Sequence, residues 1–174
     1  MDGQKHKHMD YTQSRTTQDT WRTVTLVVVA VCITMIAAVP ALLVPEAIRE
    51  WYTTLEHPSF APPNGLFAPV WMALYWMMGI AAGLVWATQN NAAVRGALVL
   101  YGMQLMLNAA WTLVFFGLHA PLGALVVILV LLALIILTVR TFFPIHRTAG
   151  WLLVPYLLWV AFATVLNAAY VWLN

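Results

Sequence analysis

Five long stretches that contain no Asp, Glu, Lys, Arg or His constrain this chain more than any other feature. They run over residues 23–44, 70–89, 97–118, 121–139 and 149–173. At a rise of about 1.5 Å per residue, each is long enough to cross a hydrocarbon core of about 30 Å. Unpaired backbone groups are costly in lipid, so spanning segments of this length fold as helices. The sequence therefore predicts an all-α membrane protein, a compact bundle of five transmembrane helices.

The composition supports this class and excludes others. The chain is 63% hydrophobic and only 8% charged, whereas a soluble domain has about 25% charged residues. Its net charge of +2 is scattered along the sequence, and nucleic-acid binding needs a basic patch or stripe. We expect membrane lipid, and no nucleic acid, to be a partner.

The chain divides into a tail and a membrane domain. Residues 1–22 are polar and aperiodic, which is typical of a disordered polar N-terminal tail. Residues 23–174 form the five-helix transmembrane domain. The first apolar run is longer than the about 7–15 residues of a signal-peptide core, so we interpret it as a retained span.

Basic residues are distributed unequally between the two sides of the predicted bundle. One side, made of the tail and the second and fourth loops, carries Lys5, Lys7, Arg15, Arg22, Arg95, Arg140 and Arg147. The other side carries only Arg49. By the positive-inside rule, the N-terminus is cytoplasmic and the C-terminus is external.

The only long connection is the loop between helices 1 and 2, residues 45–69. Pro58, Pro62 and Pro63 remove three amide donors from it and prevent a continuous helix. It leads into a helix that carries Trp71 and Tyr75 on one face. A constrained external loop over an aromatic helix face predicts a lid over a pocket. The other loops are short, with a nine-residue fourth loop over 140–148.

No side chain of the Asp, Glu, Lys, Arg and His set lies in any predicted span. Ion-coupled pumps rely on such residues within the membrane, and ordinary acid–base or nucleophilic catalysis has no candidate there. His57, His119 and His146 each lie alone in a loop, so we predict no metal site.

Amides and aromatics occupy the spans instead. Gln104, Asn108 and Trp111 share one face of the third span, and a second set of residues shares one face of the fifth span. This stripe on the fifth span consists of Trp159, Ala163, Asn167 and Tyr170. Two interpretations remain open: polar glue between helices, or, together with Trp71 and Tyr75, an aromatic cavity with a few polar groups, as small-molecule sites have.

Gly79 and Gly83 form a GxxxG motif in the second span. Such a motif permits close approach of two helices. The partner helix belongs either to a second copy of the chain or to this same chain.

Three stretches together resemble one known family. WYTTLEHPSFAPPNGLFAPVWMALYWMMG, QLMLNAAWTLVFFG and LLVPYLLWVAFATVLN are similar, in this order, to the signature stretches of the translocator protein family, the tryptophan-rich sensory proteins also called TspO/MBR or peripheral benzodiazepine receptor. The resemblance covers residues 23–174. It implies a five-helix membrane protein, in many cases a homodimer, that binds protoporphyrin IX, haem, sterols such as cholesterol and synthetic benzodiazepine-site ligands.

The resemblance also implies a ligand pocket and its residues. Carried over position by position, this pocket falls on Tyr52, Pro62, Trp71, Tyr75, Asn108, Trp111, Trp159, Ala163 and Asn167. Phe60 replaces a family tryptophan, and Ala168 replaces the tyrosine of the family's sterol motif, whose basic residue is also missing here.

Three functions follow as hypotheses. The first is binding of a tetrapyrrole, protoporphyrin IX or haem, as a ligand with no required cofactor, in tetrapyrrole homeostasis or stress signalling. The second is light-dependent degradation of porphyrin, for which the resemblance implies catalytic roles for Trp71 and Trp159. The third is transport of porphyrin or sterol.

Overall fold

The computed structural model describes the backbone of residues 2–44, 46, 50–88 and 91–174, and the side chains of these from residue 17 onward. Five long helices dominate this part of the chain: α1 (Asp2–Ile36), α4 (Phe67–Ala87), α5 (Ala92–Thr112), α6 (Pro121–Ile145) and α7 (Arg147–Leu173). All five are long and apolar enough to span a membrane. The described residues contain no strand, so the predicted all-α class and the five spans are confirmed.

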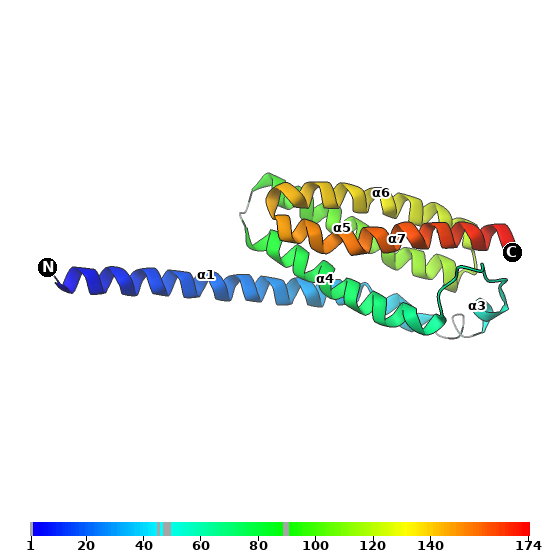
Figure 1. Cartoon of the computed structure of the whole chain (residues 1–174), viewed down its shortest axis with the longest axis horizontal. Helices are drawn as coiled ribbons and strands as arrows, with labels where there is room; N and C mark the ends of the chain where they lie inside the picture. Colours follow the sequence, from blue (N-terminus) through cyan, green and yellow to red (C-terminus); the bar gives the residue numbers. More distant parts are fainter. Residues whose placement is uncertain (1, 45, 47–49, 89–90) are drawn as a thin grey trace.

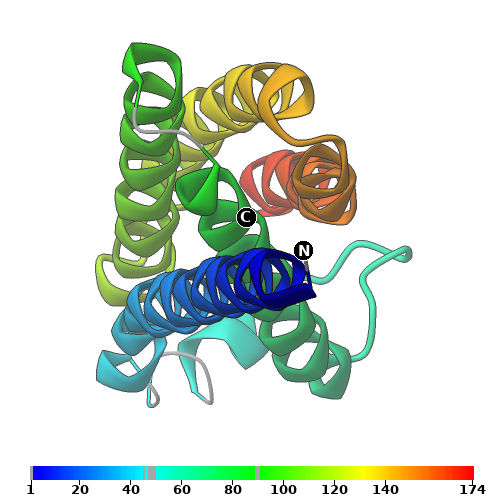
Figure 2. The same ribbon diagram turned by 90° about the vertical axis from the view of Figure 1, so that its left-hand side faces the viewer.

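The five helices form a ring (Figure 2). Helix α4 packs between α1 and α7, α6 packs between α7 and α5, and the 3-10 turn η1 (Val39–Leu43) after α1 returns to α5. A buried hydrogen bond of 2.6 Å between the hydroxyls of Thr34 and Tyr101 joins α1 to α5. A polar bond inside the bundle therefore helps to close the ring between its first helix and α5.

Gly79 and Gly83 allow α1 to lie directly on α4. A Cβ atom at Gly79 would lie 2.5 Å from the Cα of Val31, and one at Gly83 would lie 2.4 Å from the Cα of Val27. Both separations are far too short for real carbon atoms. The GxxxG motif thus serves packing within the chain, the second of the two alternatives left open by the sequence, and homodimerisation stays a prediction that needs another face.

Two helix boundaries differ from the sequence-based expectation. Helix α6 runs through Arg140 to Ile145, so the predicted nine-residue fourth loop is reduced to His146 between α6 and α7. The prediction was wrong because a charged residue marks the edge of the apolar run, whereas the backbone remains helical beyond it. His146 then begins α7, where its Nδ1 accepts a bond from the amide of Ala149 at 3.3 Å.

At the other boundary, α1 begins at Asp2 and extends beyond the bundle (Figure 1). Helix α1 therefore includes most of the segment that we expect to be a polar tail, and the disorder of that tail stays a prediction. Three short elements complete the chain: α3 (Trp51–Thr54) and η2 (Asn64–Leu66) in the first loop, and the π-helical segment η3 (Leu113–Gly117) after α5.

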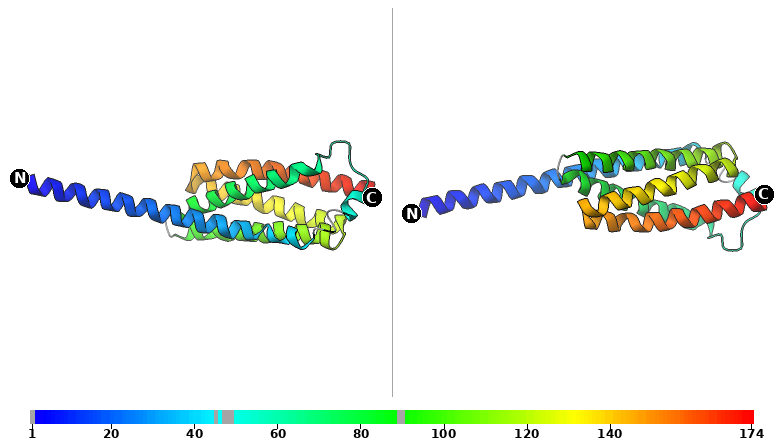
Figure 3. Two further views of the ribbon diagram at one scale, coloured as in Figure 1. Left: turned by 90° about the horizontal axis from the view of Figure 1, so that it is seen from below. Right: turned by 90° about the horizontal axis from the view of Figure 1, so that it is seen from above.

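The first loop and the C-terminus lie at the same end of the bundle (Figure 3), while the N-terminus lies at the other. The described basic residues Arg22, Arg95, Arg140 and Arg147 belong to the end from which α1 projects. This places the long loop over the end with few positive charges.

Candidate functional site

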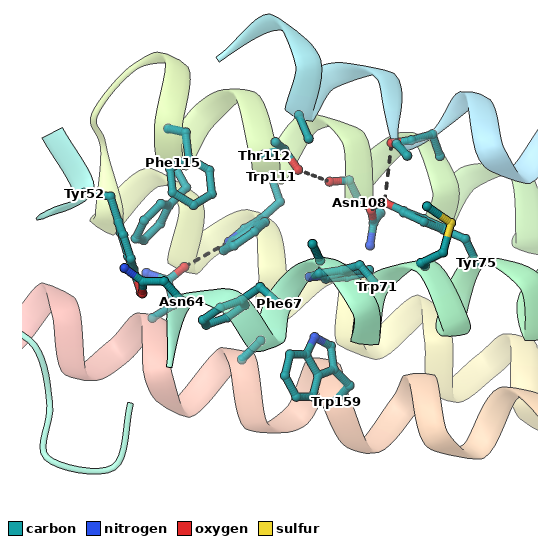
Figure 4. Close-up of a pocket in the computed structure, with 18 of the residues that line it drawn as sticks. Tyr52, Asn64, Phe67, Trp71, Tyr75, Asn108, Trp111, Thr112, Phe115 and Trp159 are labelled. Carbon is teal, nitrogen blue, oxygen red and sulfur yellow. Dashed lines mark hydrogen bonds between the residues drawn. The ribbon is translucent and has the colours of Figure 1, made fainter. Parts of the chain in front are cut away.

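A cavity of about 650 Å³ lies beneath the first loop. Its walls come from the end of α1 and the η1 turn, the first loop, α4, α5 with η3, and α7 (Figure 4). Helix α6 contributes no lining residue. The volume lies in the range of about 300–1,000 Å³ that is typical of small-molecule pockets.

The cavity gathers most of the site residues expected from the sequence. Eight of the nine line it, and they come from four separate segments: Tyr52, Trp71, Tyr75, Asn108, Trp111, Trp159, Ala163 and Asn167. Pro62 does not line it and lies half-buried in the loop.

Aromatic rings form most of the wall. Trp71 lies against Tyr75 with ring centroids 5.4 Å apart, and Trp111 stacks on Phe115 at 5.3 Å. Phe67 meets Trp159 edge-on at 6.0 Å. Figure 4 shows the three indoles brought together from α4, α5 and α7. Such a wall offers flat apolar faces that suit a flat aromatic guest.

The three indoles differ in their polar edges. The indole N–H of Trp111 donates to Oδ1 of Asn167 at 3.0 Å, so it is already paired. In the described structure, the indole nitrogens of Trp71 and Trp159 have no hydrogen-bond partner. These two N–H groups are the donors that remain available to a ligand.

The two predicted asparagines hold the protein together as well as lining the cavity. Asn167 also donates through Nδ2 to the carbonyl of Pro121 at 2.9 Å, which ties α7 to the start of α6. Asn108 accepts from the Tyr75 hydroxyl at 2.8 Å and donates to the Tyr156 hydroxyl at 3.2 Å. The two asparagines therefore both form interhelical hydrogen bonds and line the cavity, so both interpretations of these amides apply.

Residues 51–57 of the first loop, which we call the strap, are fastened to the end of α7. The Tyr170 hydroxyl lies 2.7 Å from that of Tyr52 and 2.6 Å from Nδ1 of His57. The Asn174 side chain accepts from the Glu56 amide at 2.8 Å and donates to the Glu56 carbonyl at 3.3 Å. Burial raises the pKa of Tyr52, and the bond to Tyr170 offsets part of this rise, so this hydroxyl keeps its proton at neutral pH.

The other end of the strap rests on the turn between α5 and α6. Trp51 stacks on His119 with ring centroids 4.5 Å apart and an interplanar angle of 17°. His119 has a positive φ of 51°, a left-handed conformation that is uncommon for residues other than glycine. The strap thus bridges two sides of the bundle above the cavity, as a lid would.

Sequence reasoning missed several cavity residues. Phe115 lies four residues after Trp111 and lines the cavity on the same helical face. Phe116 also lines it because η3 adds a residue to the helical turn, and the i to i+5 bond of η3 from the Leu118 amide to the Leu113 carbonyl is 2.9 Å long. Helical spacing counted from Trp111 cannot anticipate such a shift. Tyr156 does not line the cavity but contacts Trp71 edge-on behind the wall at 6.3 Å. It lies three residues before Trp159, so the stripe on the fifth span could have found it.

None of the described residues that line the cavity is charged. Among the described residues there is also no group of three His, Cys, Asp or Glu side chains that could hold a metal ion. The described lining therefore offers aromatic surface, two unpaired indole N–H groups and a few amide and hydroxyl groups.

Comparison with known proteins gives a consistent result. The model of the TspO/MBR family matches residues 27–173. A tryptophan-rich protein TspO of Chlorobaculum tepidum is 41% identical over 153 residues, which cover 86% of this chain and 97% of that protein. The TspO of Archaeoglobus fulgidus is 40% identical over 131 residues, 74% of this chain and 83% of that protein. The human translocator protein is 39% identical over 124 residues, 70% of this chain and 73% of that protein.

Proposed function

This chain belongs to the TspO/MBR family, and on that premise we propose that it binds a tetrapyrrole such as protoporphyrin IX in the cavity under its first loop. The observation that carries the proposal is the convergence of Trp71, Trp111 and Trp159 on one cavity of about 650 Å³. A flat macrocycle matches flat indole faces, and each well-packed aromatic pair contributes about 0.5–1.5 kcal/mol beyond burial.

The uncharged wall suggests how the ligand lies. A carboxylate is costly to bury without a partner, and the part of the cavity lining that the structure describes supplies no cation. The propionate groups of a porphyrin would therefore stay at the mouth, near the strap, while the ring enters. Among the described lining residues there is no His or Cys, so recognition of haem would use the macrocycle face rather than an imidazole or thiolate bond to iron.

The test is titration of purified protein in detergent with protoporphyrin IX, followed by quenching of tryptophan fluorescence. We expect saturable binding to the wild type and weaker binding to the Trp71→Phe and Trp159→Phe variants. Binding that is not saturable in the wild type, with the protein folded by circular dichroism, would overturn the proposal.

Light-dependent degradation of porphyrin is a second candidate function. It is favoured by the two unpaired indole N–H groups of Trp71 and Trp159, which both lie on the cavity wall, where their rings would contact a bound macrocycle. Illumination of the complex and a search for a new absorbing product would test it. Degradation at the wild-type rate in the Trp71→Phe and Trp159→Phe variants would remove this mechanism.

A further inference from the structure

A chain of hydrogen bonds leads from the cavity wall into the interior of the bundle. The Tyr75 hydroxyl donates to Oδ1 of Asn108 at 2.8 Å, and Nδ2 of Asn108 donates to the Tyr156 hydroxyl at 3.2 Å. The Tyr156 hydroxyl donates in turn to Oε1 of Gln104 at 2.7 Å. All four side chains are buried, and they come from α4, α5 and α7.

Every bond in this chain points the same way, from the cavity inward. Tyr75 and Asn108 line the cavity, whereas Tyr156 and Gln104 do not. Because the proton of Tyr75 is directed toward Asn108, the hydroxyl oxygen of Tyr75 is left with lone pairs for the cavity. The carbonyl oxygen of Ala37, another cavity residue, is a second and longer acceptor for the Tyr75 proton at 3.5 Å, and the shorter bond to Asn108 keeps that proton on the inner side.

Gln104 ends the chain and fixes its direction. Its Oε1 accepts the proton of Tyr156, while its Nε2 is a buried atom without a hydrogen-bond partner among the described residues. An unpaired buried donor costs free energy, so the arrangement is not explained by stability alone. Its effect is to give the Tyr156 proton an acceptor on the side away from the cavity.

We propose that Gln104 and Tyr156 are positioning residues that make the Tyr75 hydroxyl a hydrogen-bond acceptor, so that this corner of the cavity selects ligands that carry a hydroxyl or N–H group there. This inference rests on the proposed function of the cavity as a ligand site. It adds that the site presents a hydrogen-bond acceptor at Tyr75. The direction of that hydrogen bond is set by two residues that do not line the cavity, Gln104 and Tyr156.

Removal of the acceptor at position 104 has a specific consequence. In Gln104→Leu the Tyr156 proton has no partner on the inner side, and a buried unpaired hydroxyl is costly. The amide of Asn108 then turns round, accepts from Tyr156 and donates to Tyr75. The proton of Tyr75 is released toward the cavity, and the hydroxyl changes from acceptor to donor.

The experiment compares two flat neutral probes, 2-naphthol and its methyl ether, by titration calorimetry with the full chain in detergent. The measured quantity is the ratio of the dissociation constant of the ether to that of the naphthol, and Tyr75→Phe gives the baseline ratio without the hydroxyl. In the wild type we expect a ratio about 2- to 10-fold above this baseline, the span of one net hydrogen bond. In Gln104→Leu we expect the ratio to fall to the baseline or below it.

Two further variants separate positioning from mere structure. Gln104→Glu, whose protonated carboxyl still accepts from Tyr156, should restore the wild-type ratio. Thr34→Val breaks the neighbouring buried bond to Tyr101 but lies outside the chain, so it should leave the ratio unchanged. If Gln104→Leu does not fold, Gln104→Met keeps the length of the side chain and should give the same fall.

A wild-type ratio equal to the Tyr75→Phe baseline would overturn the inference, as would the absence of saturable binding of either probe. So would a Gln104→Leu ratio equal to that of the wild type. Failure of protoporphyrin IX to bind, with the naphthol ratios as expected, would overturn the proposed tetrapyrrole ligand and leave the polarity of the cavity established.

Discussion

The indole N–H of Trp111 donates to the side-chain oxygen of Asn167 at 3.0 Å, across 56 positions of sequence. This bond joins α5 to α7 at the cavity wall and turns the edge of one tryptophan away from any ligand. Asn167 holds a third element through the carbonyl of Pro121. A single amide thus fixes the relative positions of α5, α6 and α7 at the site.

Loss of this amide should loosen the bundle. Asn167→Leu leaves the Trp111 N–H without a partner and removes the interhelical bond to the Pro121 carbonyl, and interhelical hydrogen bonds in membranes contribute about 0.6–2 kcal/mol. We therefore expect a lower melting temperature in detergent by circular dichroism. Thr164→Val is the matched control on the same helix, because it removes only a local bond to the Val160 carbonyl. Equal melting temperatures for the two variants would contradict this role.

The glycine pair of α4 should be intolerant of a methyl group. Gly83→Ala places a carbon atom 2.4 Å from the Cα of Val27, and overpacking costs about 1–3 kcal/mol. Gly102→Ala on α5 meets nothing within 4 Å and removes the flexibility of glycine from a helix. We expect the first variant to melt earlier than the wild type and the second to melt at the same temperature or later. The reverse order would argue against the packing of α1 on α4.

The fastening of the strap should control how long a ligand stays. Asn174→Ala removes two hydrogen bonds to the Glu56 backbone, and each net bond contributes about 0.5–1.5 kcal/mol. We expect protoporphyrin IX to dissociate at least about twofold faster in stopped-flow displacement. Thr54→Val is the control, since its hydroxyl bonds only to the Trp51 carbonyl within the strap. An unchanged rate in Asn174→Ala would show that the strap does not limit release.

The orientation predicted from the basic residues can be tested with single cysteines. In a Cys32→Ser background, Thr54→Cys lies in the strap and Thr148→Cys lies at the exposed start of α7, at the opposite end of the bundle. We expect a membrane-impermeant maleimide to label the first variant in intact cells and the second only after permeabilisation. The opposite pattern would reverse the topology.

The sequence anticipates the broad features because lipid leaves few alternatives. Uncharged runs of spanning length require helices, and helical spacing alone puts Asn108 and Trp111 on one face and Trp159 and Asn167 on another. The structure joins these faces through the bond from Trp111 to Asn167. The family resemblance supplied Tyr52, which spacing could not relate to α7.

Other features depend on contacts that periodicity does not encode. The π-helical turn that brings in Phe116 depends on local backbone packing, and Pro62 lies away from the cavity because the loop path is set by the strap. The GxxxG motif alone could not show which helix packs against α4, because a helix of a second chain could approach the glycines as closely as α1 does. Of the first half of the first loop the structure gives α3, and positions 45 and 47–49 lie outside the described residues.

The most direct measurement of the central claim is protoporphyrin IX titration of three tryptophan variants side by side. Trp71→Phe and Trp159→Phe alter the cavity wall, whereas Trp76→Phe alters a ring on α4 that is 52% exposed on the outer surface of the bundle. The account predicts a dissociation constant about 2- to 10-fold higher in the first two variants and a wild-type value in the third. Equal dissociation constants in all three variants and the wild type would contradict it.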